Sequence, residues 1–165
     1  MPAVISDSSP LIYLQHLGRF EFLRKIYTTL LVPPAVWLEV GEHGGHRAEG
    51  RALRTGVEEG WIAVVAVSGD PVSAELLALG AGEREAIQLA YERDALLLID
   101  EARGREIALR LGVNLTGTLG VLVEAKKKGL ITQVRPELDR LAEETTFRVS
   151  ERVRQHILHL AGELT

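Results

Sequence analysis

An uninterrupted apolar run that ends in two acids constrains the fold of this chain most strongly. Residues Leu96–Ile99 are all aliphatic, and Asp100 and Glu101 follow them directly before a helical pattern begins. Such a run is typical of a strand that is buried on both faces, as in a parallel sheet covered by helices. The chain starts in the same way, because Val4-Ile5 leads through Ser6 to Asp7 and then to a helix. Sites in open α/β sheets lie at the carboxyl ends of strands, so Asp7 and Asp100 are candidates for one shared site.

Strand-like and helix-like segments alternate along most of the chain, which favours a parallel sheet with helices on both faces. We therefore predict an α/β fold with three layers (α/β/α) and a central parallel sheet of about five strands. The expected strands are residues 3–5, 29–32, 61–65, 96–99 and 113–115. The expected helices are 10–17, 20–26, 34–40, 47–55, 72–79, 83–93, 101–111, 118–128, 136–143 and 151–164, with a glycine-rich loop at 41–45.

The length of 165 residues suggests one domain. We expect residues 1–145 to form the domain and residues 146–165 to form a helical tail that packs on it or binds a partner. The absence of cysteine excludes disulfides, zinc–thiolate sites and cysteine nucleophiles. The net charge of −4 means that a nucleic-acid partner would need a local basic patch. No stretch is apolar enough to span a bilayer, and Asp7 interrupts any signal-peptide core, so we expect a cytoplasmic protein without a membrane partner.

Four carboxylates stand where a shared site would need them. Asp7 follows the first strand and Asp100 the fourth, while Glu39 and Glu83 lie on apolar faces of their predicted helices. Each has a simpler alternative: Glu39 could reach water, Glu83 could favour a helix dipole, and Asp100 could cap a helix. For Asp7 the capping alternative is weaker, because Ser9 already offers an N-cap before Pro10.

Four unpaired carboxylates in one crevice would repel one another and raise their pKa values. A divalent cation resolves this conflict, and oxygen ligands without cysteine favour Mg²⁺ or Mn²⁺. Such ions catalyse phosphoryl displacement by activating water and stabilising the leaving oxygen. The sequence thus points to metal-dependent phosphoryl displacement.

The order and spacing of these motifs resemble those of PIN-domain proteins. The resemblance covers roughly residues 3–142 and is carried by the stretches 5–14, 32–40, 82–87 and 97–101. A Thr-Gly-Thr-Leu-Gly stretch at Thr116–Gly120 is similar to that of a VapC-like subgroup. Two departures stand out: many PIN domains have Asp where Glu83 stands, and this subgroup often has Asp where Glu101 stands. The tail after Phe147 is also untypical of compact PIN toxins.

The resemblance implies a Mg²⁺- or Mn²⁺-dependent endoribonuclease, often the toxin of a type II toxin–antitoxin pair. It implies an RNA substrate, a small antitoxin partner and a homodimer. Its catalytic acids map onto Asp7, Glu39, Glu83 and Asp100, and its metal ligands onto the same four with Glu101. Thr116 or Thr118 would hold a water or the scissile phosphate, although either Thr116 or Gly117 could simply cap the next helix.

Basic and imidazole side chains are weaker candidates. Arg103 belongs to the densest group of positive charges and could contact RNA phosphates. Lys126–Lys128 could do so too, but a solvated helix face explains that run better. His43 and His46 flank two glycines, which favours a flexible surface loop over a metal site.

Other functions explain the sequence less well. A phospho-receiver domain needs a lysine near its last strand, and Asn114-Leu115-Thr116 offers none. A phosphatase of the haloacid type needs Asp-x-Asp at the first strand, whereas the chain has Asp7-Ser8-Ser9. A catalytically degenerate PIN fold that serves as a protein-binding module remains the alternative, because the last predicted helix is amphipathic.

Overall fold

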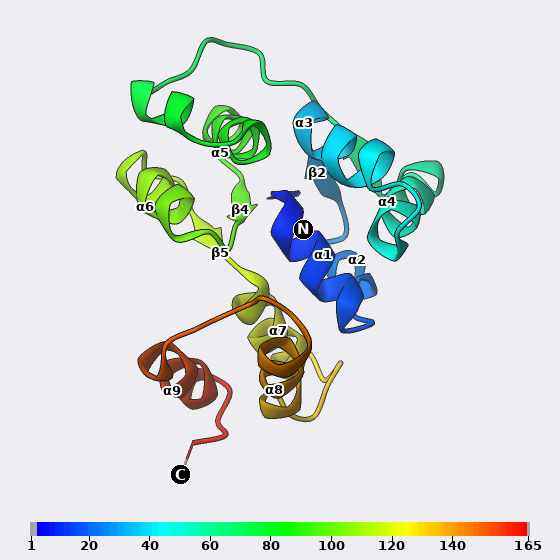
Figure 1. The fold of residues 1–165 in the computed structure, drawn as a ribbon, viewed down its shortest axis with the longest axis vertical. Helices are drawn as coiled ribbons and strands as arrows, with labels where there is room; N and C mark the ends of the chain where they lie inside the picture. Colours follow the sequence, from blue (N-terminus) through cyan, green and yellow to red (C-terminus); the bar gives the residue numbers. More distant parts are fainter. Residues whose placement is uncertain (1–2, 165) are drawn as a thin grey trace.

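A five-stranded parallel sheet forms the centre of the molecule, as the sequence predicts. The computed structural model describes residues 3–164. The strands follow the order β3-β2-β1-β4-β5, and all neighbours are parallel. Their bounds are β1 (Val4–Ser6), β2 (Leu30–Val32), β3 (Ile62–Val64), β4 (Leu96–Leu98) and β5 (Leu115–Thr116). The chain builds the sheet outward from β1 to β3 and then returns to the other side of β1 (Figure 1). This reversal between β1 and β4 opens a crevice at the carboxyl ends of the strands.

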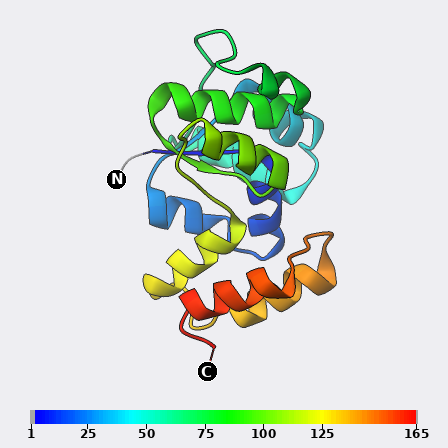
Figure 2. The same ribbon diagram turned by 90° about the vertical axis from the view of Figure 1, so that its left-hand side faces the viewer.

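Helices cover both faces of the sheet, which confirms the α/β/α class. They are α1 (Ser8–His16), α2 (Glu21–Tyr27), α3 (Pro34–Val36), the π-helix η1 (Trp37–His43), α4 (Ala48–Glu58), the 3₁₀-helix η2 (Ala74–Ala78), α5 (Ala81–Arg93), α6 (Ala102–Arg110), α7 (Thr118–Lys127), α8 (Arg135–Glu144) and α9 (Glu151–Leu160). Figure 2 shows α5 and α6 on one side of the sheet and α1, α2 and α7 on the other.

Alternate residues of each central strand enter opposite cores. Val4 and Leu98 pack with the helices of the α1 side, whereas Ile5 and Leu97 pack with those of the α5 side. All four side chains are fully buried. The strands are therefore buried on both faces, as their continuous apolar runs predict, because such a strand needs apolar residues at every position.

Two predictions about loops and strands are wrong. The glycine-rich stretch expected as a loop at residues 41–45 is mostly helical, because η1 continues from α3 as far as His43. A π-helix has a wider turn than an α-helix and often marks a functional segment. The last strand lies about two residues later than expected, at Leu115–Thr116.

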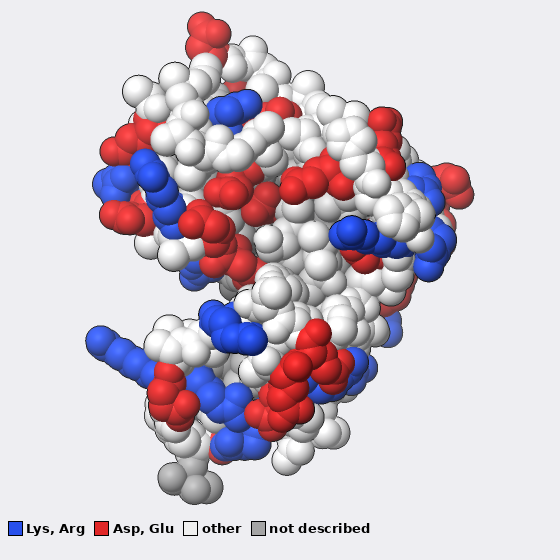
Figure 3. Space-filling view, in the orientation of Figure 1, with Lys and Arg blue, Asp and Glu red and all other residues white. Residues whose placement is uncertain are grey.

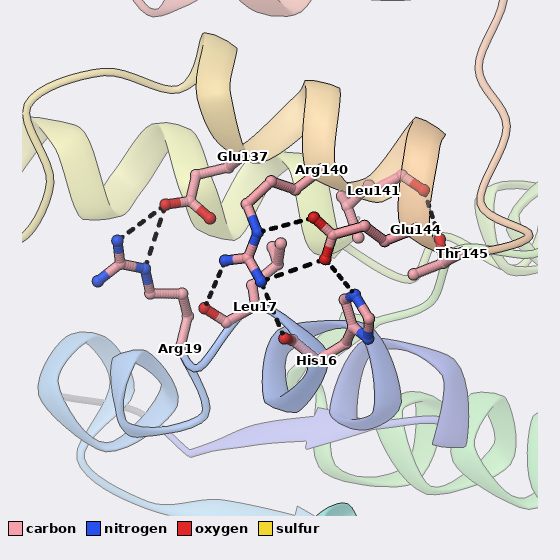
Figure 4. Close-up of polar contacts among 8 residues, drawn as sticks. All are labelled: His16, Leu17, Arg19, Glu137, Arg140, Leu141, Glu144 and Thr145. Carbon is pink, nitrogen blue, oxygen red and sulfur yellow. Dashed lines mark hydrogen bonds and ion pairs between the residues drawn. The ribbon is translucent and has the colours of Figure 1, made fainter.

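Helix α8 docks on the turn between α1 and α2 through a polar network (Figure 4). Arg19 donates two hydrogen bonds to Glu137, at 2.8 and 3.2 Å. Arg140 reaches the carbonyl oxygen of Leu17 at 3.3 Å, and His16 binds Glu144 at 2.9 Å. The network satisfies backbone groups that the turn leaves free and fixes α8 against the first helices.

The segment after α8 folds back on the domain. Phe147, Ile157 and Leu158 are buried in the core of the α1 side. Beyond α9, the carboxylate of Glu163 accepts the backbone N–H groups of Val134 and Arg135 at 2.6 and 3.0 Å. Residues 1, 2 and 165 of the expected domain and tail lie outside the described residues. No helix in the described part of the chain has the length and apolar character to cross a membrane.

Candidate active site

A cavity of about 420 Å³ opens where β1 ends and two helices begin. Three segments line it: the start of α1, one face of α3 and η1, and the first turn of α5. The lining residues are Asp7, Ser8, Ser9, Ala35, Leu38, Glu39, His43, Gly80, Ala81, Gly82 and Glu83. The structure thus brings three of the four candidate carboxylates, Asp7, Glu39 and Glu83, into one cavity.

Asp7 lies at the base of this cavity and is only 4% exposed. Contrary to the prediction, Ser9 is not the N-cap of α1, because the helix already starts at Ser8 and Asp7 holds the cap position. The Asp7 side chain nevertheless makes no capping hydrogen bond. Burial raises its pKa to about 6, and the charges of Glu39, Asp100 and Glu101 act in the same direction, against a hydrogen bond from the Ser8 backbone.

Glu39 is exposed at the mouth of the cavity and is oriented by α1. The hydroxyl of Ser8 donates to Glu39 Oε2 at 2.6 Å. Glu39 lies in the π-helix η1, so the α-helical spacing expected from the sequence does not apply to it. It lines the cavity together with the apolar Ala35, but it reaches water at the edge of the apolar face, which is the simpler alternative given above.

Glu83 lies in the first turn of α5 and faces the same space. Burial raises its pKa to about 7, and Asp7 and Glu101 add to the shift. The preceding Gly82 allows α5 to come close, since a Cβ atom there would lie 3.0 Å from Glu39 Oε2 and 3.4 Å from Asp7 Oδ1. A side chain at position 82 would therefore crowd the Glu39 carboxylate and lie in contact with that of Asp7.

Asp100 extends from the end of β4 and is held by the start of α7. Its two carboxylate oxygens accept the backbone N–H of Thr118 at 2.8 Å and the Thr118 hydroxyl at 2.7 Å. Burial raises the pKa of Asp100, while the bonds from Thr118 and the charge of Arg105 oppose that shift. Asp100 does not line the cavity, but its charge is one of those that raise the pKa of Asp7.

Glu101 caps helix α6. Its oxygens accept the backbone N–H groups of Arg103 at 3.0 Å and Gly104 at 2.6 Å. Glu101 also lies near Glu83, because a hydrogen bond between the two side chains contributes to the raised pKa of Glu83. The second acid of the Asp100-Glu101 pair thus serves the fold as an N-cap and adds negative charge beside the cavity.

The other substrate-binding candidates lie apart from the cavity. Thr118 is fully buried and positions Asp100. Thr116 lines a different hollow of about 480 Å³, which α2, α7 and α9 surround. Arg103 is exposed on the first turn of α6. As placed, none of the three lines the space that Asp7, Glu39 and Glu83 enclose.

The cavity region is strongly acidic but contains no ready-made metal site. Figure 3 shows acidic side chains gathered at the middle of the face, beside its hollow. Within residues 3–164, no three acidic or histidine side chains converge closely enough to hold an ion. The carboxylates are close enough to raise one another's pKa values but too far apart to share an ion. Charge repulsion acts over many ångströms, whereas ligands must lie about 2.1 Å from a Mg²⁺ ion.

His43 is a lining residue that could not be recognised from the sequence. We expected a flexible loop there, but His43 ends η1 and lines the cavity, whereas His46 does not. Its position four residues after Glu39 is the one signal that could have placed it on the same helical wall.

Residues 3–163 match a family model described as a PIN domain. No curated protein matches the chain significantly. Among solved structures, a PilT N-terminus domain protein from the hyperthermophilic archaeon Sulfolobus solfataricus P2 is 23% identical, with a TM-score of 0.52, over 76% of this chain and 93% of that one. VapBC2 from Rickettsia felis, solved with a DNA fragment from their promoter, is 12% identical, with a TM-score of 0.45, over 70% and 98%. The Sulfolobus structure supports the fold.

Proposed function

This chain belongs to the PIN-domain family, and from that premise we propose that it is a metal-dependent endoribonuclease that hydrolyses RNA phosphodiester bonds. We place it in the VapC-like subgroup because of the Thr116–Gly120 stretch. The observation that carries the proposal is the group of mutually repelling carboxylates around one cavity. Asp7 and Glu83 have pKa values near 6 and 7, close to the pH at which the protein would work. Carboxyl groups with strongly raised pKa values cluster at functional sites.

The donor set suits a hard divalent cation. The ligands we propose are Asp7, Glu39, Glu83 and Asp100, with Glu101 beside Glu83 as a further oxygen donor. All are carboxylates, which Mg²⁺ and Mn²⁺ prefer over nitrogen or sulfur ligands. When bound, the ion would supply Lewis-acid activation of water and would neutralise charge on the phosphate.

Residues around the carboxylates hold them in place for that task. Ser8 fixes one oxygen of Glu39, and Thr118 fixes both oxygens of Asp100. Gly82 lets the start of α5 approach Asp7 and Glu39. Such partners orient ligands and commonly change metal affinity or activity by roughly 10–100-fold when they are lost.

The test is RNA cleavage by purified protein with Mn²⁺, comparing the wild type with Asp7→Asn. We expect the cleavage rate of the variant to fall by more than roughly 100-fold, which is the most that losing a residue behind a metal ligand commonly costs. Its circular dichroism should be unchanged. Asp70→Asn is the matched control, because Asp70 is an exposed acid in the loop before η2. Equal cleavage by the Asp7→Asn variant would contradict the assignment. A folded wild type that binds no cation and cleaves no RNA would favour the degenerate, protein-binding alternative.

We extend the proposal to the toxin role, with a small antitoxin partner, a homodimer and a cytoplasmic location. This part follows from the resemblance of the motifs rather than from the site geometry. We also propose that residues 146–164 belong to the folded unit, since α9 and Glu163 pack against it. Light scattering of the purified protein would measure its mass, and a monomer at micromolar concentration would contradict the homodimer.

A further inference from the structure

One side chain in the cavity differs in charge from the others that ionise. The ionisable lining residues are the carboxylates Asp7, Glu39 and Glu83 and the imidazole of His43. The remaining described lining residues are two serines, three glycines or alanines of the α5 start, and the apolar Ala35 and Leu38. His43 is therefore the one lining residue whose side chain is positively charged when it carries a proton, and an imidazolium can hand that proton to an oxygen atom.

His43 shares a wall with a proposed metal ligand. Glu39 and His43 lie four residues apart in η1, and both line the cavity together with Ala35 and Leu38. The neighbouring acid Glu42 is turned to another partner, since its Oε1 accepts the indole N–H of Trp37 at 3.1 Å. His43 thus belongs to the wall of the cavity, whereas the side chain of Glu42 binds elsewhere.

The segment that carries His43 is held in place. Arg54 of α4 donates to the carbonyl oxygens of Gly41 and Gly45, each at 2.7 Å. The Gly44 N–H closes the last wide turn on Glu39 O at 3.1 Å. Gly50 packs so closely that a Cβ atom there would lie 2.5 Å from Gly44 O. The wall is therefore ordered structure on both sides of His43, as a proton donor requires.

We propose that His43 is a catalytic residue that protonates the leaving oxygen during phosphodiester cleavage, an inference that rests on the proposed nuclease function. Water oxygen forms the new bond to phosphorus, and the bond from phosphorus to the ribose oxygen breaks. The electron pair of that bond goes to the ribose oxygen, which takes the proton from the imidazolium. The attacking water gives its proton to solvent, and solvent protonates His43 again. No oxidant or further reactant is needed.

The test compares two substrates that differ in the leaving atom. The first is an RNA oligonucleotide that the wild type cleaves at a mapped bond. The second is the same oligonucleotide with sulfur in place of the leaving oxygen, because a thiolate leaves without a proton. We expect His43→Gln to cleave the first on the order of 10²-fold more slowly and the second within about threefold of the wild-type rate. His46→Gln is the control, and it should match the wild type on both.

Each other outcome has a defined meaning. Equal slowing of both substrates by His43→Gln, or no slowing of either, would overturn the proton-donor role alone. Loss of Mn²⁺ binding in His43→Gln, measured by calorimetry, would overturn it in favour of a metal ligand. A wild type that cleaves neither substrate, while folded, would overturn the nuclease proposal and this inference with it. His43 is exposed, so its replacement should leave the fold intact.

Discussion

Replacing Asp7 with asparagine should stabilise the metal-free protein while it removes the proposed activity. Asp7 is almost fully buried, and burial with neighbouring acids raises its pKa from 3.8 to about 6. The folded protein therefore takes up a proton between pH 4 and pH 6 that the unfolded chain does not bind. Stability falls as the pH rises through that window and stays low above it, because the folded state must then hold a buried charge. Asparagine has nearly the same shape and carries no charge.

The size of the effect follows from the shift. The pKa of Asp7 rises from 3.8 to about 6, and each pH unit corresponds to about 1.36 kcal/mol. The free energy of unfolding of the variant should therefore exceed that of the wild type by at most about 3 kcal/mol at pH 7.5. For a chain of this length, 1 kcal/mol corresponds to roughly 3 °C in Tm, so the variant should melt up to about 9 °C higher. The gain should shrink as the pH falls and vanish only below about pH 3, where wild-type Asp7 is protonated in both states.

The assay is urea and thermal unfolding at pH 7.5, 5.5 and 4.2 with a chelator present. Asp70→Asn, which removes an exposed charge, should change stability little at any pH. Added Mn²⁺ at 100 times its Kd should stabilise the wild type by about 2.7 kcal/mol and the Asp7→Asn variant far less. A variant that is no more stable than the wild type at pH 7.5, or a gain that does not depend on pH, would refute the electrostatic reasoning.

Three further predictions concern contacts that hold the site and its surroundings. Arg54→Ala should lower the free energy of unfolding in urea by about 2 kcal/mol, because the guanidinium binds two carbonyl oxygens at the end of η1. The variant should also cleave RNA more slowly. Unchanged cleavage would show that this end of η1 has no role in catalysis. Arg19→Ala should cost about 3 kcal/mol, since it leaves the carboxylate of Glu137, 5% exposed and with Oε2 already unpartnered, without its charge partner. Glu137→Gln should cost less than Arg19→Ala, and the reverse order would contradict the buried-charge argument. Burial opposes the lowered pKa of Glu163, but its bonds from two backbone N–H groups and Lys126 prevail. Its stabilisation should therefore be present above its ordinary pKa of 4.5 and lost as the pH falls through the lower folded value, a slope that Glu163→Gln should remove.

Much of the fold could be predicted because it depends on short-range patterns. The runs Val4–Ile5 and Leu96–Ile99 are apolar at consecutive positions. Short runs of this kind are typical of strands that are buried on both faces. Ser150 stands directly before the last helix and is a favoured N-cap residue, and its hydroxyl accepts the Val153 N–H at 3.1 Å. The predictions for the last strand and for the loop at 41–45 were wrong for two reasons. The strand is too short for its bounds to be read from the sequence, and local propensity does not specify a π-helix.

The candidate site was predictable only as a set of acids. The sequence separates Asp7, Glu39 and Glu83 by more than 30 residues each, and the sheet order brings them to one cavity. It did not reveal that Asp7 takes the cap position of α1 without capping, because cap geometry depends on where the chain leaves the strand. Nor did it distinguish Glu101, whose oxygens cap α6, from acids that face the cavity.

The sequence by itself determined the layers of this protein, the order of its elements and the acids at the strand ends. These properties follow from the period of apolar residues and from local start and stop signals, which neighbouring residues decide. Only the tertiary structure decided which acids share a cavity, that Thr118 serves Asp100 rather than the cavity, and that His43 lines it. Those outcomes depend on distances between segments far apart in the chain, and such distances are set by packing on the sheet.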